Sequence, residues 1–172
     1  GLVSTAAGTG ISGSGTDQLT YPNKIHVDSS GNIYVTDYSN HRIMKWAPGA
    51  TSGTVVAGGN GYGSATNQLY NPSGIHVDSS GNIYIADQSN HRIMKWLSGA
   101  ASGTVVAGTS GSSGAGNNQL NNPQKIHVDA NGTIYILDQN NHRVMKWAPG
   151  ASLGTVVAGT GTAGSGNDQL SN

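Results

Sequence analysis

The stretch IHVDSSGNIYVTDYSNHRIMKWAPGATSGTVVAG, residues 25–58, returns almost unchanged at residues 75–108 and again at residues 126–159. The first two copies differ at only six positions, and the His-Val-Asp triplet recurs after 50 and then 51 residues. A period of this length is typical of one supersecondary unit repeated in a solenoid, a propeller or an array. The chain is therefore expected to consist of three similar units.

Hydrophobic and polar residues alternate within the unit. Residues 24–28 and 33–37 both alternate and are separated by a polar turn, which predicts a β-hairpin. A second polar break, residues 38–40, leads into residues 41–46, and a turn with Pro and Gly leads into the apolar run 54–57. No window has the three- and four-residue spacing of a helix. Each unit thus predicts four short antiparallel strands, A to D, and the fold class is an all-β propeller.

Three segments of the second copy carry a family resemblance. NPSGIHVD at residues 71–78, GNIYIAD at residues 81–87 and NHRI at residues 90–93 resemble the NHL repeat, which is named after an Asn-His-Leu triplet. The resemblance covers essentially the whole chain, but Arg92 stands where the family has Leu, and His76 where it usually has a small or apolar residue. It implies a closed propeller, most often six-bladed, that serves as a binding platform for proteins, RNA or small ligands; a few relatives are enzymes.

The repeat divides the chain into one propeller segment. LVSTAAG at residues 2–8 aligns with LGTVVAG at residues 153–159, so it is interpreted as a partial strand D ahead of the first blade. The predicted divisions are a partial strand D with a connector (1–21), blade 1 (22–58), a connector with blade 2 (59–108), a connector with blade 3 (109–159) and a trailing connector (160–172).

Three blades are too few for a closed propeller, which needs about four to eight. A three-blade wedge would expose an apolar sheet face at each end. Either the chain is a piece of a longer array, as its start without Met suggests, or two chains combine their blades. We predict a homodimer that closes a six-bladed ring, because apolar burial yields about 25 cal/mol per Å² and two-fold closure is the commonest oligomeric solution.

Composition narrows the possible partners. Eight basic and eight acidic residues cancel, which disfavours nucleic acid as a ligand because binding to phosphates needs a basic surface. No apolar run approaches the roughly 18 residues of a membrane span, so no membrane association is predicted. The chain has no Cys, which excludes disulfides and thiolate metal sites, and no cofactor is predicted.

The six histidines form two sets of three. His41, His91 and His142 follow Asn, and we expect each to fix the turn between strands B and C by hydrogen bonding to the nearby Asp or to the backbone. The other set lies on strand A, the innermost strand, and comprises His26, His76 and His127. These imidazoles either pack between blades or could bind Zn, Ni or Cu near the axis.

Other residues recur once per blade. The set Trp46, Trp96 and Trp147 ends strand C; packing against strand D is favoured over a role as sugar-stacking platforms. The set Asp28, Asp78 and Asp129 is expected to cap the A–B hairpin. Each connector also carries Gln-Leu, from which we expect the Leu to fill the blade junction and the Gln to bind backbone groups.

An active site normally needs a unique constellation, whereas the Asp and His residues recur in every copy, so no enzyme is predicted. The positions that vary are the place to look for a ligand surface: Tyr38, Gln88, Gln139, Tyr62 and Tyr70. The predicted function is a self-associating binding or scaffold module for a protein or glycan. The alternatives are a multivalent lectin, a metal-dependent lyase or hydrolase, and an engineered or recently amplified array without an evolved ligand.

Overall fold

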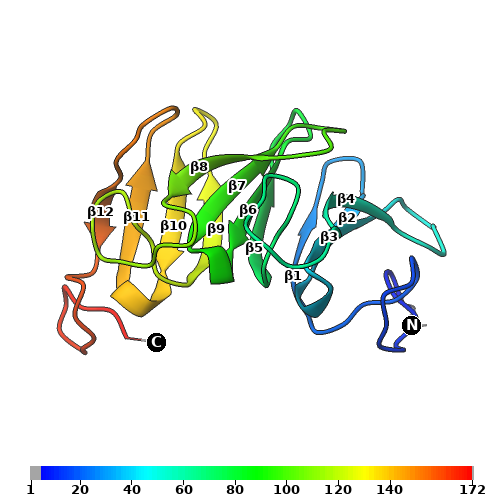
Figure 1. Ribbon diagram of the computed structural model, residues 1–172, viewed down its shortest axis with the longest axis horizontal. Coiled ribbons are helices and arrows are strands. Elements are labelled where there is room, and N and C mark those ends of the chain that lie inside the picture. Colours follow the sequence, from blue (N-terminus) through cyan, green and yellow to red (C-terminus); the bar gives the residue numbers. More distant parts are fainter. Residues whose placement is uncertain (1–4, 172) are drawn as a thin grey trace.

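The computed structural model describes residues 5–171, which form three four-stranded antiparallel sheets arranged as an arc (Figure 1). Within each sheet the strands lie in sequence order. Blade 1 contains β1 (Pro22–Val27), β2 (Ile33–Asp37), β3 (Arg42–Trp46) and β4 (Thr54–Gly58). Blade 2 contains β5 (Pro72–Val77), β6 (Ile83–Asp87), β7 (Arg92–Trp96) and β8 (Thr104–Gly108). Blade 3 contains β9 (Pro123–Val128), β10 (Ile134–Asp138), β11 (Arg143–Trp147) and β12 (Thr155–Ala158).

Single 3₁₀ turns join the second and third strands of each blade: η1 (Tyr38–Asn40), η2 (Gln88–Asn90) and η3 (Gln139–Asn141). The histidine after each turn adopts a left-handed backbone conformation, with φ of 54° at His41. This conformation ends the turn, and the third strand therefore begins one residue later than the alternation predicted. No helix in the described part of the chain has the length and apolar character needed to cross a membrane.

The first hairpin of each blade is closed by an aspartate, as the sequence predicted. Asp28 Oδ1 accepts hydrogen bonds from the backbone N–H groups of Ser30 and Asn32, both at 2.9 Å. Gly31 lies within the turn at φ +79°, where a side chain would be strained. Hydrogen bonds, first of all from the Asn32 amide, hold the pKa of Asp28 below its usual value. The carboxylate is therefore a structural acceptor.

The innermost strands β1, β5 and β9 lie side by side, and the blades pack face to face around them. We call the side of a blade that faces the preceding blade its leading face, and the opposite side its trailing face. At the junction of blades 1 and 2, the trailing face presents Tyr34, Ile43 and Ala57, and the leading face presents Ile85 and Trp96, all buried in one cluster. The junction of blades 2 and 3 repeats this arrangement.

The connector leucines complete these junctions. Leu69 and Leu120 are fully buried, one in each junction, which confirms the expectation that they fill the space between blades. The glutamines bind the connector backbone, as predicted: Gln18 Oε1 accepts from Gly15 N–H at 3.2 Å, and Gln68 Nε2 donates to the Asn60 carbonyl at 3.0 Å. The connectors are thus ordered by their own side chains.

Each end of the arc exposes part of a face that is buried at the internal junctions. On the leading face of blade 1, Ile25 is 67% exposed, whereas its counterpart Ile75 is 8% exposed. On the trailing face of blade 3, Ala158 is exposed, whereas Ala107 is buried. Residues 5–8, where a partial outer strand was predicted, form bends and no strand; the rest of that predicted strand lies outside the described residues.

Candidate functional site

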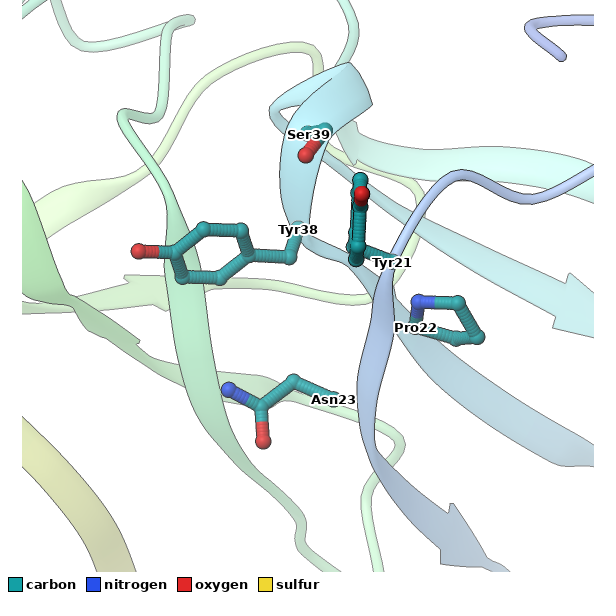
Figure 2. A pocket seen from close by; sticks show the side chains of 5 residues that line it. All are labelled: Tyr21, Pro22, Asn23, Tyr38 and Ser39. Carbon is teal, nitrogen blue, oxygen red and sulfur yellow. The ribbon is translucent and has the colours of Figure 1, made fainter. Parts of the chain in front are cut away.

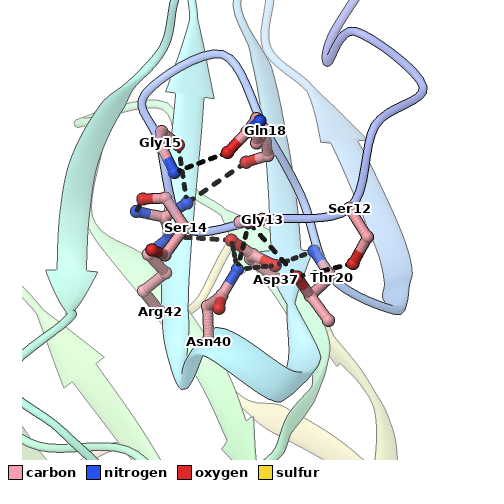
Figure 3. A network of polar contacts seen from close by, with 9 residues as sticks. All are labelled: Ser12, Gly13, Ser14, Gly15, Gln18, Thr20, Asp37, Asn40 and Arg42. Carbon is pink, nitrogen blue, oxygen red and sulfur yellow. Dashed lines mark hydrogen bonds and ion pairs between the residues drawn. The ribbon is translucent and has the colours of Figure 1, made fainter.

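A buried polar network holds each of the first three connectors to the blade that follows it, and Figure 3 shows the network of blade 1. In blade 1, Arg42 Nε donates to Asp37 Oδ2 at 2.7 Å, and Asn40 Nδ2 donates to both carboxylate oxygens. The Arg42 guanidinium also donates to the carbonyl groups of Ser14, Gly15 and Gln18 at 2.8, 2.9 and 3.1 Å, and the Thr20 N–H donates to Asp37 Oδ1 at 2.7 Å. The other two blades repeat the pair as Asp87–Arg92 and Asp138–Arg143.

This network corrects part of the role predicted for the histidines that follow Asn, which are His41, His91 and His142. The aspartate pairs with arginine and asparagine, so an Asp–His hydrogen bond is not what fixes the turn. His41 Nδ1 instead accepts the Asn71 N–H, and His91 Nδ1 the Asn122 N–H, both at 3.2 Å. A histidine–backbone bond therefore exists, but it reaches the connector before the next blade. The sequence signal for the true aspartate partner was the arginine that replaces Leu after Asn-His.

His142 differs from its two counterparts. Its Nδ1 is buried and accepts no hydrogen bond within the described residues 5–171. Asn172, which matches Asn71 and Asn122 in the repeat, lies outside that range. His142 lines a hollow together with Leu137 and Leu170.

The three tryptophans are buried, each 1% exposed. Their rings cover the glycine that precedes the outermost strand: a Cβ added to Gly53 would lie 2.8 Å from the Trp46 ring. The packing role favoured from the sequence is what the structure shows. The faces of Trp46, Trp96 and Trp147 are closed to a sugar in this arrangement.

The strand A histidines form a row across the innermost strands. The ring centroids of His26 and His76 lie 5.3 Å apart, and those of His76 and His127 lie 5.4 Å apart. Burial lowers the pKa of His76 and of His26, and the two neighbouring imidazoles lower that of His76 further. Among residues 5–171, no group of three or more His, Cys, Asp or Glu side chains is arranged to hold a metal ion. The geometry therefore gives the metal hypothesis no support.

The varying turn residues Tyr38, Gln88 and Gln139 begin the three 3₁₀ turns and are all half-buried. Tyr38 lines a hollow of about 540 Å³ beside Tyr21, Pro22 and Asn23, all from blade 1 and the connector before it (Figure 2). Gln139 lines a second hollow, of about 290 Å³, at the open trailing side of blade 3. Gln88 lies in the middle blade, and its Oε1 is buried without a hydrogen bond in the described chain. The structure does not bring these three residues together.

Two other variable residues, Tyr62 and Tyr70, do come together with a histidine that recurs in every blade. The rings of His41, Tyr62 and Tyr70 meet at the junction of blades 1 and 2, with centroid separations of 5.7, 5.5 and 5.3 Å. We call these three residues the aromatic cluster. Tyr62 is 68% exposed and Tyr70 is 38% exposed. Their variation between repeats was visible in the sequence, but their proximity to His41 was not.

The NHL repeat profile matches residues 19–46, 69–96 and 120–147, one segment in each blade. The chain carries three NHL repeats. Each match begins at a connector leucine and ends at a tryptophan, so the NHL repeat of this chain comprises the junction leucine and the first three strands. No curated protein matches the chain in sequence.

Solved structures share the propeller fold at low identity. A protein of unknown function from Bacteroides thetaiotaomicron matches with a TM-score of 0.63 and 18% identity, over 88% of this chain and 40% of its own. An auxiliary nutrient binding protein from the same organism matches with a TM-score of 0.60 and 14% identity, over 83% of this chain and 38% of its own. A catalytically inactive virginiamycin B lyase from Staphylococcus aureus, solved with quinupristin, matches with a TM-score of 0.50 and 11% identity, over 85% of this chain and 42% of its own. The NHL-repeat chain thus spans less than half the length of each.

Proposed function

We propose that this NHL-repeat protein is a non-enzymatic binding or scaffold module whose six-bladed ring is completed by a second copy of the chain. The observation that supports this most directly is the match between its two exposed end faces. Blade 3 ends in a trailing face of the kind that the two internal junctions bury, and the innermost strand of blade 1 exposes Ile25 and Val27, whose counterparts they bury. The outer part of that leading face, with Val35, Met44 and Trp46, is already covered by Leu19 and Ala7 of the same chain. Two copies related by a two-fold axis would make two further junctions of the same kind.

The residues of the end faces support this pairing in detail. Ile25 and Val27 on blade 1 are 67% and 54% exposed, whereas Ile75 and Val77 at the same positions of blade 2 are 8% and 6% exposed. On blade 3, Val157 is 48% exposed. Since blade 2 buries its leading face against a trailing face built like that of blade 3, apolar burial favours the closed ring.

Ring closure would place two connectors at each new junction, whereas an internal junction holds one. The leading connector, residues 9–21, is bound through three of its carbonyl groups by Arg42. Among residues 5–171, no arginine binds the trailing connector, residues 160–171, and Leu170 is only half-buried. The trailing connector is therefore the one that would leave, with Leu19 of the other copy filling the junction.

We propose a module without catalytic activity because the candidate acid and base groups, the buried aspartate of each blade and the histidines His41 and His91, already have hydrogen-bond partners within the protein. The carboxylate of Asp37 accepts hydrogen bonds from a guanidinium, an amide and a backbone N–H and is fully buried, and Asp87 and Asp138 are bound in the same way. The Nδ1 atoms of His41 and His91 accept backbone N–H groups. The hydrogen bonds that stabilise the fold occupy these carboxylate oxygens and imidazole nitrogens, so they are poorly placed to accept a proton from a substrate.

Light scattering behind size exclusion tests the self-association. We expect a mass of twice 17.5 kDa, and a return to 17.5 kDa for Ile25→Lys, which places a charge on the closing face. Val105→Lys is the matched control, because Val105 is 42% exposed on the outermost strand of the middle blade. Removal of residues 160–172 should strengthen the dimer. A monomer at all concentrations, in both the full chain and the shortened chain, would overturn the closed ring.

A further inference from the structure

The aromatic cluster lies at the junction between blades 1 and 2 with both tyrosines accessible, and hydrogen bonds hold the backbone on either side of it. The Tyr70 N–H donates to Asp87 Oδ1 at 2.7 Å, and the Tyr70 carbonyl accepts from the Ser89 N–H at 3.1 Å. His41 is fixed by its bond to the Asn71 N–H. Since Nδ1 is the acceptor, the neutral ring carries its proton on Nε2.

The fold does not need the two tyrosines. Every connector forms the same isolated bridge between the position of Tyr62 and the junction leucine. The other connectors nevertheless have small residues in place of both tyrosines: Ser12, Ser113 and Ala163 for Tyr62, and Thr20, Asn121 and Ser171 for Tyr70. The histidine, by contrast, occurs in all three blades. A pair of exposed aromatic rings that the scaffold does not require indicates a contact surface.

The groups around the cluster favour an uncharged ligand. Asp87 and Arg92, which hold this connector, are buried and paired with each other at 2.7 Å, so they offer no charge to a bound molecule. Burial lowers the pKa of His41 and outweighs the nearby carboxylates of Asp87 and Asp37, which act to raise it. The imidazole is therefore neutral at pH 7. Tyrosine rings present an apolar face together with a hydroxyl group that donates or accepts a hydrogen bond.

We propose that the aromatic cluster of His41, Tyr62 and Tyr70 is a binding site for a neutral carbohydrate. One side of a pyranose ring presents C–H groups that pack on an aromatic face, while its hydroxyl groups bond to the tyrosine hydroxyls and to His41 Nε2–H. The site gives the proposed binding module a ligand class. It lies within one chain, so its test does not depend on ring closure.

The first test is titration calorimetry with neutral oligosaccharides of the glucose, mannose and galactose series. We expect one site per chain and about fivefold weaker binding for Tyr62→Ala and for Tyr70→Ala, since a stacked ring contributes roughly 1 kcal/mol and 1.4 kcal/mol is tenfold. Tyr62→Phe keeps the ring and should retain most of the affinity. Unchanged circular dichroism and solution mass show that the fold is intact.

The repeat allows a gain-of-site variant. Ser113→Tyr combined with Asn121→Tyr builds the same pair beside His91, and we expect the stoichiometry to rise to two sugars per chain. Three results would overturn the proposal: no binding of any sugar in the series at millimolar concentration, binding that Tyr62→Ala and Tyr70→Ala leave unchanged, or binding of a proline-rich peptide in place of the sugars. These sugar-binding results can be interpreted whether light scattering shows a monomer or a dimer, because the site lies within one chain.

Discussion

Arg92 Nε lies 2.7 Å from Asp87 Oδ2 across the neighbouring strands β6 and β7, and the exposed fractions of the two side chains are only 2% and 0%. The same guanidinium binds the carbonyl groups of Ser64, Ala65 and Gln68 in the connector before the blade. One side chain therefore joins two strands to a Gly-rich segment with no regular structure of its own. This explains why the chain tolerates an arginine where the NHL triplet has leucine.

Replacement of this arginine by leucine should be strongly destabilising. Arg92→Leu leaves Asp87 buried without its counter-charge and three carbonyl groups without a donor, so we expect the free energy of unfolding to fall by about 3–5 kcal/mol. Urea denaturation followed by tryptophan fluorescence measures it. Lys95→Ala is the control, since Lys95 only lies over the Tyr84 ring at 5.0 Å and should cost about 1 kcal/mol or less. A loss below about 1 kcal/mol for Arg92→Leu would contradict the structural role.

Two glycines of the middle blade should respond differently to alanine. A Cβ at Gly103 would lie 2.5 Å from Cε3 of the buried Trp96, whereas a Cβ at Gly99 meets nothing within 4 Å but has a φ of +76°. We expect Gly103→Ala to cost about 2–3 kcal/mol through overpacking, and Gly99→Ala about 1 kcal/mol through backbone strain alone. The distinguishing measurement is the near-ultraviolet circular dichroism of tryptophan, which should change only in Gly103→Ala. Equal spectra would show that the ring has room to move.

Tyr21 occupies a backbone position that suits asparagine better. Its φ is +51°, and the equivalent residues Asn71 and Asn122 have φ values of +52° and +53°. Because asparagine adopts this left-handed region more readily than a bulky residue, Tyr21→Asn should raise the free energy of unfolding by about 0.5–1 kcal/mol. Thermal denaturation of the monomeric Ile25→Lys background isolates the backbone effect. Tyr62→Asn, at an exposed site without a positive φ, should give no such gain.

The histidine row should make stability depend on pH. Burial and two neighbouring imidazoles lower the pKa of His76 below the value of about 6.5 expected in the unfolded chain, and burial lowers that of His26. The unfolded chain therefore takes up protons first, and the free energy of unfolding should decrease as the pH falls from 7.5 to 5.5. The lowered pKa values of Asp28 and Asp78 act below about pH 4, outside this window.

The variant His76→Gln should reduce this pH dependence, because one depressed titration is removed while His26, His41 and His91 remain. Urea midpoints of the two proteins at pH 7.5 and pH 5.5 provide the comparison. The variant should lose less stability than the parent chain on acidification. An identical loss in both proteins would show that His76 does not contribute.

The sequence predicted the strands well because alternation is a local signal. The predicted segment 33–37 coincides with β2, and the segment 54–57 differs from β4 by one residue. Two of the errors lie where a turn ends a strand: His41 takes a left-handed conformation, and Asp28 accepts hydrogen bonds in the hairpin turn. The first strand also begins earlier than predicted, at Pro22 and not at Lys24. The Gln-Leu pairs and the buried tryptophans were also assigned correctly, since a large side chain at a fixed place in every repeat is usually part of the packing.

The sequence by itself determined the repeat, the four strands of each blade and the NHL character of the chain, because each is a local pattern within one unit or the recurrence of that pattern along the chain. Only the tertiary structure decided which groups pair. The partner of Asp37 proved to be Arg42, the His41 ring met Tyr62 and Tyr70 of the following connector, and the strand A histidines came to lie in one row. These contacts depend on how a connector folds back and how one blade packs on the next, and no periodicity within a single repeat encodes that geometry.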